Sequence, residues 1–127
     1  MQPTKVYIAA ADPGFGKRLQ GILEQNAFQV SLFERGYDVA AMLDNWPDIF
    51  LIDIQLPDIN GLEVCSWLKS HEDSSHIPVI LMTNEHYLKI FAATAHADDC
   101  VEIRKAATQI VHKINDCLSA VRVEHKA

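Results

Sequence analysis

Short apolar runs of strand length alternate along this chain with stretches in which apolar residues recur at helical spacing. Three of the runs have no polar break, which is typical of strands buried on both faces of a parallel sheet. A fourth alternates around Val30 and Leu32, and the fifth is the weakest. The five predicted strands cover residues 6–10, 28–32, 49–52, 79–82 and 100–103.

Apolar residues three and four apart predict a helix after each strand. The last helix is the clearest, because one apolar stripe holds for four turns; its members are Ala107, Ile110, Val111, Ile114, Leu118 and Val121. The other predicted helices centre on residues 15–23, 39–43, 64–68 and 87–95. Cys65 lies on its helix's apolar stripe and is expected in the core. Trp67 lies off that stripe, as an ordinary exposed aromatic or as an anchor for a partner.

This order of elements predicts a doubly wound α/β fold. Strand and helix alternate five times, which gives one five-stranded parallel sheet with helices on both faces, joined by right-handed crossovers. Turn-forming residues fall between the elements, at Pro13-Gly14, Trp46-Pro47, Pro57-Asp58 and Ile77-Pro78. Without an internal repeat or a linker-like tract, residues 1–127 are expected to form a single domain.

Composition narrows the classes of function. With 17 acidic and 11 basic residues the net charge is −6, which disfavours direct binding to nucleic acid. No apolar run reaches the roughly 18 residues of a membrane span, and the first residues lack the apolar stretch of a signal peptide. The widely spaced Cys65, Cys100 and Cys117 favour reduced thiols in the cytoplasm over a disulfide framework or a zinc site.

Polar residues follow the predicted strands at the edge where a doubly wound sheet places its ligands, the carboxyl ends of the strands. Asp53 ends the most apolar strand and precedes a turn around Asn60-Gly61. Thr83 ends the next strand, and Asp12 follows the first. A hydroxyl beside a carboxylate can donate a hydrogen bond to an oxygen that the carboxylate acquires. The chemistry is therefore expected around Asp53.

Residues 51–65, LIDIQLPDINGLEVC, resemble the phosphoacceptor segment of response-regulator receiver (CheY-like) domains. The similarity continues through Leu68-Lys69, residues 76–83 (HIPVILMT) and Ala97-Asp98-Asp99, so it spans nearly the whole chain. The resemblance implies a flavodoxin-like (βα)5 fold with strand order 2-1-3-4-5. It also implies a role in two-component phosphorelay signalling, as a switch and not as an enzyme acting on a separate substrate.

The resemblance assigns roles to individual residues. The aspartate matching Asp53 takes a phosphoryl group from a histidine kinase or a phosphotransfer protein, and the hydroxyl matching Thr83 binds phosphoryl oxygens. A Mg²⁺ ion offsets the repulsion between the carboxylate and the phosphoryl group. Its expected ligands are Asp53 and the backbone carbonyl of Gln55, with Asp12 as a weaker candidate. A downstream protein partner would then bind the surface of helix 4, strand 5 and helix 5.

Several positions depart from the receiver pattern. Ala10 and Ala11 fall on the acidic pair that holds Mg²⁺ in the family, and Asp12 falls one position late. Asp12 is instead expected to cap a helix that begins at Pro13. Ile103 occupies the position of the family's lysine. Three of the five side chains that the resemblance implies at the site are therefore replaced by apolar ones, and the Mg²⁺ site is expected to be weak.

Two hypotheses of different class stay open. In the first, the chain is an atypical response-regulator receiver in which Asp53 is phosphorylated. Arg104 or Lys105 would then have to swing toward the site in place of the lysine. In the second, it is a phosphorylation-independent pseudo-receiver that acts as a protein–protein interaction module. A homodimer is compatible with either hypothesis, and so are a stand-alone receiver and a piece of a longer regulator.

Overall fold

The computed structural model describes residues 2–42, 45–84, 93 and 95–126, with side chains as far as Val121. Five parallel strands form one sheet in the order β2-β1-β3-β4-β5. They are β1 (Lys5–Ala9), β2 (Gln29–Phe33), β3 (Ile49–Asp53), β4 (Val79–Thr83) and β5 (Asp99–Glu102). This confirms the doubly wound α/β fold and the strand order 2-1-3-4-5.

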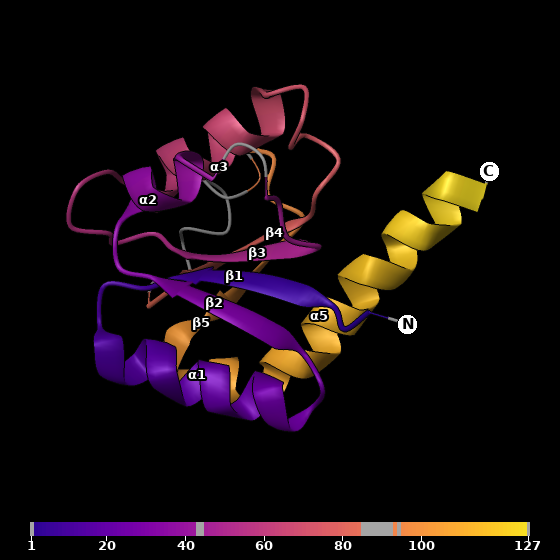
Figure 1. Cartoon of the computed structure of the whole chain (residues 1–127). Coiled ribbons are helices and arrows are strands. Elements are labelled where there is room, and N and C mark those ends of the chain that lie inside the picture. Colours follow the sequence, from indigo (N-terminus) through magenta and orange to yellow (C-terminus); the bar gives the residue numbers. More distant parts are fainter. Residues whose placement is uncertain (1, 43–44, 85–92, 94, 127) are drawn as a thin grey trace.

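Helices cover both faces of the sheet (Figure 1). On one face lie α1 (Pro13–Gln25) and α5 (Ile103–Lys126), and on the other α2 (Gly36–Ala40) and α3 (Gly61–Ser70). The helix predicted over residues 87–95 falls almost wholly outside the described residues. Within the described part of the chain, no helix is both long and apolar enough to span a membrane.

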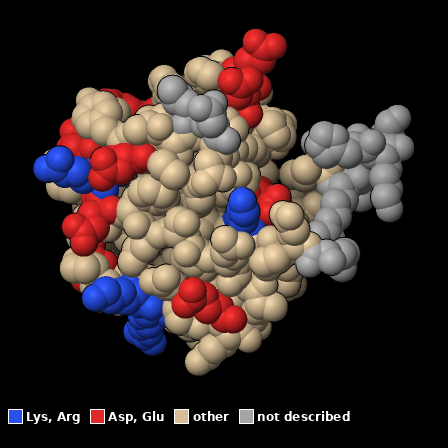
Figure 2. Space-filling model, viewed as in Figure 1, with Lys and Arg blue, Asp and Glu red and all other residues tan. Residues whose placement is uncertain are grey.

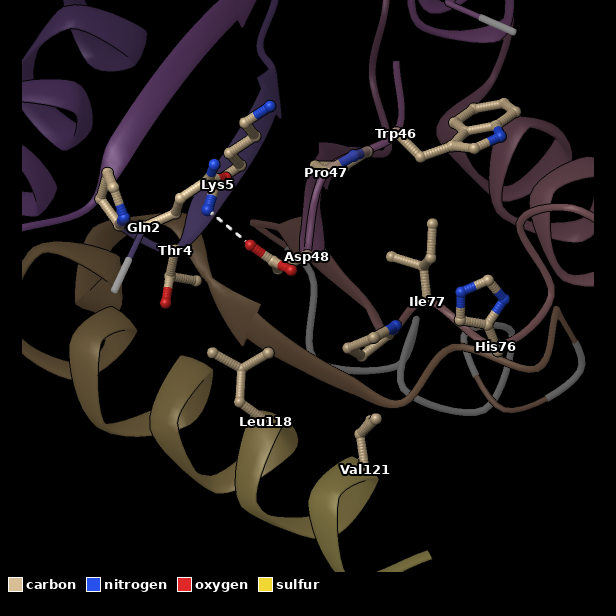
Figure 3. Close-up of a pocket in the computed structure, with 12 residues that line it drawn as sticks. Gln2, Thr4, Lys5, Trp46, Pro47, Asp48, His76, Ile77, Leu118 and Val121 are labelled. Atoms are coloured by element: carbon tan, nitrogen blue, oxygen red, sulfur yellow. Dashed lines mark hydrogen bonds between the residues drawn. The ribbon is translucent and has the colours of Figure 1, made fainter. Parts of the chain in front are cut away.

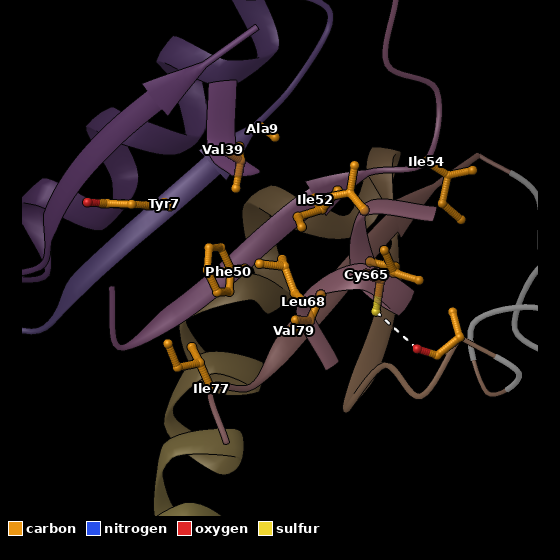
Figure 4. Close-up of a cluster of buried hydrophobic side chains, with 13 residues drawn as sticks. Tyr7, Ala9, Val39, Phe50, Ile52, Ile54, Cys65, Leu68, Ile77 and Val79 are labelled. Carbon is orange, nitrogen blue, oxygen red and sulfur yellow. Dashed lines mark hydrogen bonds between the residues drawn. The ribbon is translucent and has the colours of Figure 1, made fainter. Parts of the chain in front are cut away.

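The sheet separates two clusters of buried side chains, one under each helical layer. Figure 4 shows the cluster beneath α2 and α3, where Phe50 and Ile52 of β3 meet Leu68 of α3. Cys65 is fully buried in this cluster, and its Sγ donates a hydrogen bond to the carbonyl of Ala95 at 3.5 Å. The core position predicted for Cys65 is confirmed. Each large apolar side chain that is fully buried in this cluster, such as Phe50 or Leu68, stabilises the fold by about 1.5–3 kcal/mol.

Helix α1 begins as the sequence predicts. Asp12 is its N-cap and Pro13 its first residue. The Asp12 carboxylate accepts hydrogen bonds from the backbone N–H groups of Gly14 and Phe15, at 2.9 and 3.4 Å. These bonds satisfy two of the N–H groups that have no partner within the helix.

Helix α2 differs from its prediction. The apolar spacing of Val39 and Met42 predicted a helix over residues 39–43, but α2 runs from Gly36 to Ala40. Its start is set from another part of the chain, because the carboxylate of Asp58 accepts hydrogen bonds from the N–H groups of Gly36 and Tyr37 at 2.9 and 3.0 Å. A contact between residues more than twenty positions apart leaves no mark in local spacing.

The last strand is also shifted from its prediction over residues 100–103. Strand β4 ends at Thr83, whose partner in the register is Glu102, so β5 has no neighbour to pair with beyond that residue. Ile103 is therefore the first residue of α5. The rest of α5 follows the predicted stripe, with Ile110 and Ile114 fully buried against the sheet. Its final turns project beyond the sheet (Figure 1).

Candidate functional site at the carboxyl edge of the sheet

The parallel topology brings the carboxyl ends of β1, β3 and β4 side by side at one edge of the sheet. Ala9 of β1 pairs with Ile52, so Ala10 follows β1 beside Asp53 at the end of β3. Asp53 pairs in turn with Met82, and Thr83 is the next residue of β4. The structure therefore gathers the predicted residues Asp53 and Thr83 at the ends of adjacent strands.

Asp53 is a buried carboxylate, only 6% exposed. Its Oδ1 accepts a hydrogen bond from the N–H of Gln55 at 2.9 Å. Burial raises the pKa of Asp53, the N–H groups of Gln55 and Ala11 oppose that shift, and the charge of Asp12 adds to it. No ion pair to Asp53 is found among the residues that the structure describes. Its negative charge is therefore held mainly by backbone dipoles.

Gly61 lets α3 start directly against the backbone at the end of β3. A Cβ at Gly61 would lie 2.2 Å from the carbonyl oxygen of Asp53 and 2.7 Å from the Cα of Ile54. The Gly61 N–H donates to the Ile54 carbonyl at 2.8 Å, and the Asn60 side chain caps the helix through the N–H of Leu62. The sequence predicts a turn at Asn60-Gly61, but the need for glycine at this contact shows only in the structure.

Thr83 is also buried, with 5% exposure. It ends β4 opposite Glu102 and takes part in further interactions. The predicted role of its hydroxyl, binding phosphoryl oxygens, stays a prediction. So does the role of the Gln55 carbonyl.

The remaining candidates are occupied elsewhere. The carboxylate of Asp12 is engaged with the first turn of α1. Arg104 Nε lies 3.0 Å and Lys105 Nζ 4.0 Å from the same oxygen of Glu102. The swing of Arg104 or Lys105 toward Asp53 is therefore not observed, because a carboxylate lies nearer to both.

Two further lysines lie at the opposite edge of the sheet, near the amino ends of β4 and β5, and pair with Asp98 and Asp99. Lys69 lies 2.9 Å from Asp98, which also accepts from the N–H of Val79 at 2.8 Å. Lys113 lies 3.1 Å from Asp99. These pairs join α3 and α5 to the sheet, so Asp98 and Asp99 serve the fold.

A comparison with known proteins decides the family. The model of the response regulator receiver domain matches residues 6–115. The chain belongs to this family. The receiver resemblance drawn from residues 51–65 is confirmed, and with it a place in two-component signal transduction.

Relatives and solved structures agree with this assignment. The polar-differentiation response regulator DivK of Brucella ovis is 37% identical over 68 residues, 53% of this chain and 55% of that protein, so the chain spans about half the length of the curated relatives it matches. The receiver domain of a histidine kinase from Syntrophus aciditrophicus is 26% identical with a TM-score of 0.85, covering 93% and 92% of the two chains. A CheY-like receiver from Methanospirillum hungatei JF-1, 22% identical with a TM-score of 0.85 over 96% and 98%, shares the fold.

Receiver membership implies Mg²⁺, and the residues at this edge were tested against it. Ala10 and Ala11 supply no side-chain oxygen, and Asp12 already accepts two N–H groups. Asp53 is left as one buried carboxylate beside the carbonyl of Gln55. Among the described residues no group of three His, Cys, Asp or Glu side chains could hold a metal ion. Mg²⁺ demands near-octahedral oxygen coordination and sheds water reluctantly. The donor set does not fit a firmly held Mg²⁺.

A cavity of about 540 Å³ lies far from this site, at the amino ends of the strands (Figure 3). Trp46 and His76 line one side of it, and Leu118 and Val121 of α5 line another. Asp48 on its wall accepts a hydrogen bond from the backbone N–H of Lys5 at 2.8 Å. The cavity takes no part in the chemistry around Asp53.

Proposed function

We propose that this receiver domain is an interaction module whose partner binding does not require phosphorylation of Asp53. The observation that carries the proposal is the set of side chains around Asp53. Ala10, Ala11 and Ile103 occupy the positions at which the receiver pattern supplies two carboxylates and a lysine. The fold is retained while the charges that serve the chemistry are not.

Electrostatics explains why this set matters. Phosphoryl transfer to Asp53 brings an anionic group against a buried anion, and catalysis of such a transfer consists mostly of positioning and charge neutralisation. Glu102 holds Arg104 and Lys105. The phosphorylated form would also lack the lysine that binds its oxygens. Phosphorylation of Asp53 is therefore expected to be slow and its product poorly stabilised.

A second candidate function keeps Asp53 as the phosphoacceptor. It is supported by the buried carboxylate of Asp53 at the strand end, with Thr83 on the adjacent strand. In that case a histidine kinase or a phosphotransfer protein would supply the phosphoryl group, and water or Asp12 would complete the coordination of Mg²⁺. The surface of helix 4, β5 and α5 would then carry the signal to a downstream protein.

Partner and location follow from the same proposal. A module of this kind acts through another protein and not through nucleic acid, since the chain carries a net charge of −6. Among the described residues Cys65, Cys100 and Cys117 form no disulfide bond, which favours the cytoplasm. A homodimer is a further form that the module could take.

The test is intact mass after incubation with acetyl phosphate, with and without Mg²⁺, beside Asp53→Asn. We expect no Mg²⁺-dependent gain of a phosphoryl group in the wild-type chain. A gain that disappears in Asp53→Asn would overturn the proposal and establish the second candidate. Incubation with phosphorylated histidine kinases or phosphotransfer proteins extends the test to a demanding donor.

A gain-of-function variant makes a negative result informative. Ala10→Asp, Ala11→Asp and Ile103→Lys together restore the receiver pattern around Asp53. This triple variant is expected to take up a Mg²⁺-dependent phosphoryl group under conditions in which the wild-type chain does not. If the triple variant also fails, the missing charges are not what prevents the reaction.

A further inference from the structure

Two aromatic side chains stand out on the surface of the described residues. Tyr37 of α2 is 61% exposed and Trp67 of α3 is 38% exposed. Trp67 rests on His71, with ring centroids 4.8 Å apart, so its ring is held in place. The sequence prediction of an exposed Trp67 is confirmed. Rigid exposed aromatics are the residue type most enriched at the centres of protein interfaces.

Tyr37 belongs to α2 and Trp67 to α3, and these two helices pack against each other along a seam. A Cβ at Gly36 would lie 2.8 Å from Val64, so the start of α2 packs on α3 at that residue. Trp67 follows Val64 by three residues and lies on the same flank of α3, whereas Cys65 and Lys69 face Ala95 and Asp98 on the opposite flank. Helix α2 has only five residues. Trp67, near the end of α3, keeps 38% of its surface exposed.

The exposed charges around this seam are mostly negative. Five exposed acidic residues lie on or beside the two helices: Glu34, Asp38, Glu63, Glu72 and Asp73. Of the two basic residues, Arg35 is exposed, while Lys69 is 13% exposed and paired with Asp98. Figure 2 shows red surface beside α2 and at the end of α3. An apolar strip with an acidic border calls for a partner that is apolar and basic.

We propose that the seam of α2 and α3 is a docking surface for a basic amphipathic segment of a protein partner, with Tyr37 and Trp67 as its apolar anchors. This rests on the proposed function as an interaction module. The lysines or arginines of the partner segment would pair with Glu63 and Asp38, while the apolar face of that segment covers the rings of Tyr37 and Trp67. The surface is distinct from that of β5 and α5.

A second copy of the chain fits this surface poorly. In a two-fold dimer the same patch meets itself, so the acidic border of one copy, with Glu63 and Asp38, would face the acidic border of the other. Like charges brought together at an interface disfavour association. The acidic border therefore selects a partner of opposite charge and discourages self-association through this seam.

The experiment uses a fluorescein-labelled helical peptide built from leucine and lysine, followed by fluorescence anisotropy with the full chain. A leucine–glutamate peptide and a serine–lysine peptide serve as matched probes for charge and for apolar contact. Only the leucine–lysine peptide should bind, and its affinity should fall with salt. Amide shifts in ¹⁵N spectra should cluster on Gly36–Ala40 and Gly61–Ser70.

Variants distinguish binding at the seam from a general attraction of the peptide to the negatively charged chain. Tyr37→Ser, Trp67→Ser and Glu63→Lys are each expected to weaken binding about tenfold. Glu24→Lys reverses an exposed charge on α1, across the sheet, and should leave the affinity within about twofold. Because Trp67 is partly buried, circular dichroism checks its variant, and the more exposed Tyr37 and Glu63 carry the test if it unfolds.

The outcomes are separable from those of the proposed function. No binding of the leucine–lysine peptide, equal losses in Glu24→Lys, amide shifts confined to α5, or a dimer through the seam would each overturn the docking surface. None of these depends on Asp53. Conversely, a phosphoryl group on Asp53 in the mass measurement overturns the proposed function while the peptide affinity still reports on the seam.

Discussion

At the scale of single residues, Asp53 at the end of β3 and Asp58 in the loop that follows occupy opposite electrostatic environments. Burial raises the pKa of Asp53. Slight burial also acts to raise the pKa of Asp58, but hydrogen bonds from the N–H groups of Tyr37 and Gly36 outweigh it and lower that pKa. The charge of Asp53 therefore lowers the stability of the folded state, whereas the charge of Asp58 raises it.

Asp53→Asn is expected to stabilise the fold at neutral pH. The raised pKa means that folding disfavours the charged form, so the cost of that charge is present above the folded pKa. This cost decreases as the pH falls toward 3.8, the ordinary pKa of an aspartate. Urea unfolding of wild type and variant across this range measures the difference. Equal stability at neutral pH would contradict the burial argument.

Asp58→Asn is expected to have the opposite sign. A lowered pKa means that the carboxylate stabilises the folded state above the ordinary value of 3.8, and that this contribution is lost as pH falls through the folded pKa. The variant should therefore be less stable than wild type at neutral pH and should approach it in acid. The same urea series measures it, and a variant more stable than wild type would refute the capping role.

Gly61→Ala tests the close approach of α3 to β3. The nearest atoms to the new Cβ are backbone atoms of Asp53 and Ile54, which cannot rotate away. We expect a loss of about 1–3 kcal/mol in the free energy of unfolding. Gly21→Ala is the matched control, because nothing lies within 4 Å of a Cβ there. That helical position should gain about 0.5–1 kcal/mol.

At the scale of elements, the start of α1 separates two roles for Asp12. As an N-cap, Asp12→Ala should cost about 0.5–2 kcal/mol of stability, whereas Asp12→Asn keeps an acceptor oxygen and should cost much less. Thermal unfolding of both variants compares them. Equal losses would show that the charge, and not the cap, is what the fold uses.

The elements also show what the sequence can and cannot predict. Buried strands and long helices follow from local spacing, as in β3 and in the α5 stripe through Ile110 and Ile114. The short α2 does not, because its start depends on Asp58. At the site, Asp53 and Thr83 could be predicted from their strand ends. The engagement of Arg104 and Lys105 with Glu102 could not, since it depends on where β5 ends.

At the scale of the whole molecule, Cys65 reports on global unfolding. It is fully buried, and burial raises the pKa of its thiol to about 12. In a Cys100→Ser, Cys117→Ser background, iodoacetamide should modify Cys65 only as the fold opens, with a rate that rises with urea alongside the unfolding curve. Intact mass follows the reaction. Modification at the rate of a free cysteine in native buffer would contradict this burial.

The length of α5 fixes a direction in space. The 24 residues of α5 form a helix about 36 Å long. A five-residue strand is only about 17 Å long. The last turns of α5 therefore continue past the sheet as a straight rod. Any domain fused to this rod by an unbroken helix would inherit its rotational phase. Each residue inserted in such a fusion would turn that domain by about 100° around the rod. Helix length would then set which face of the sheet the fused domain meets.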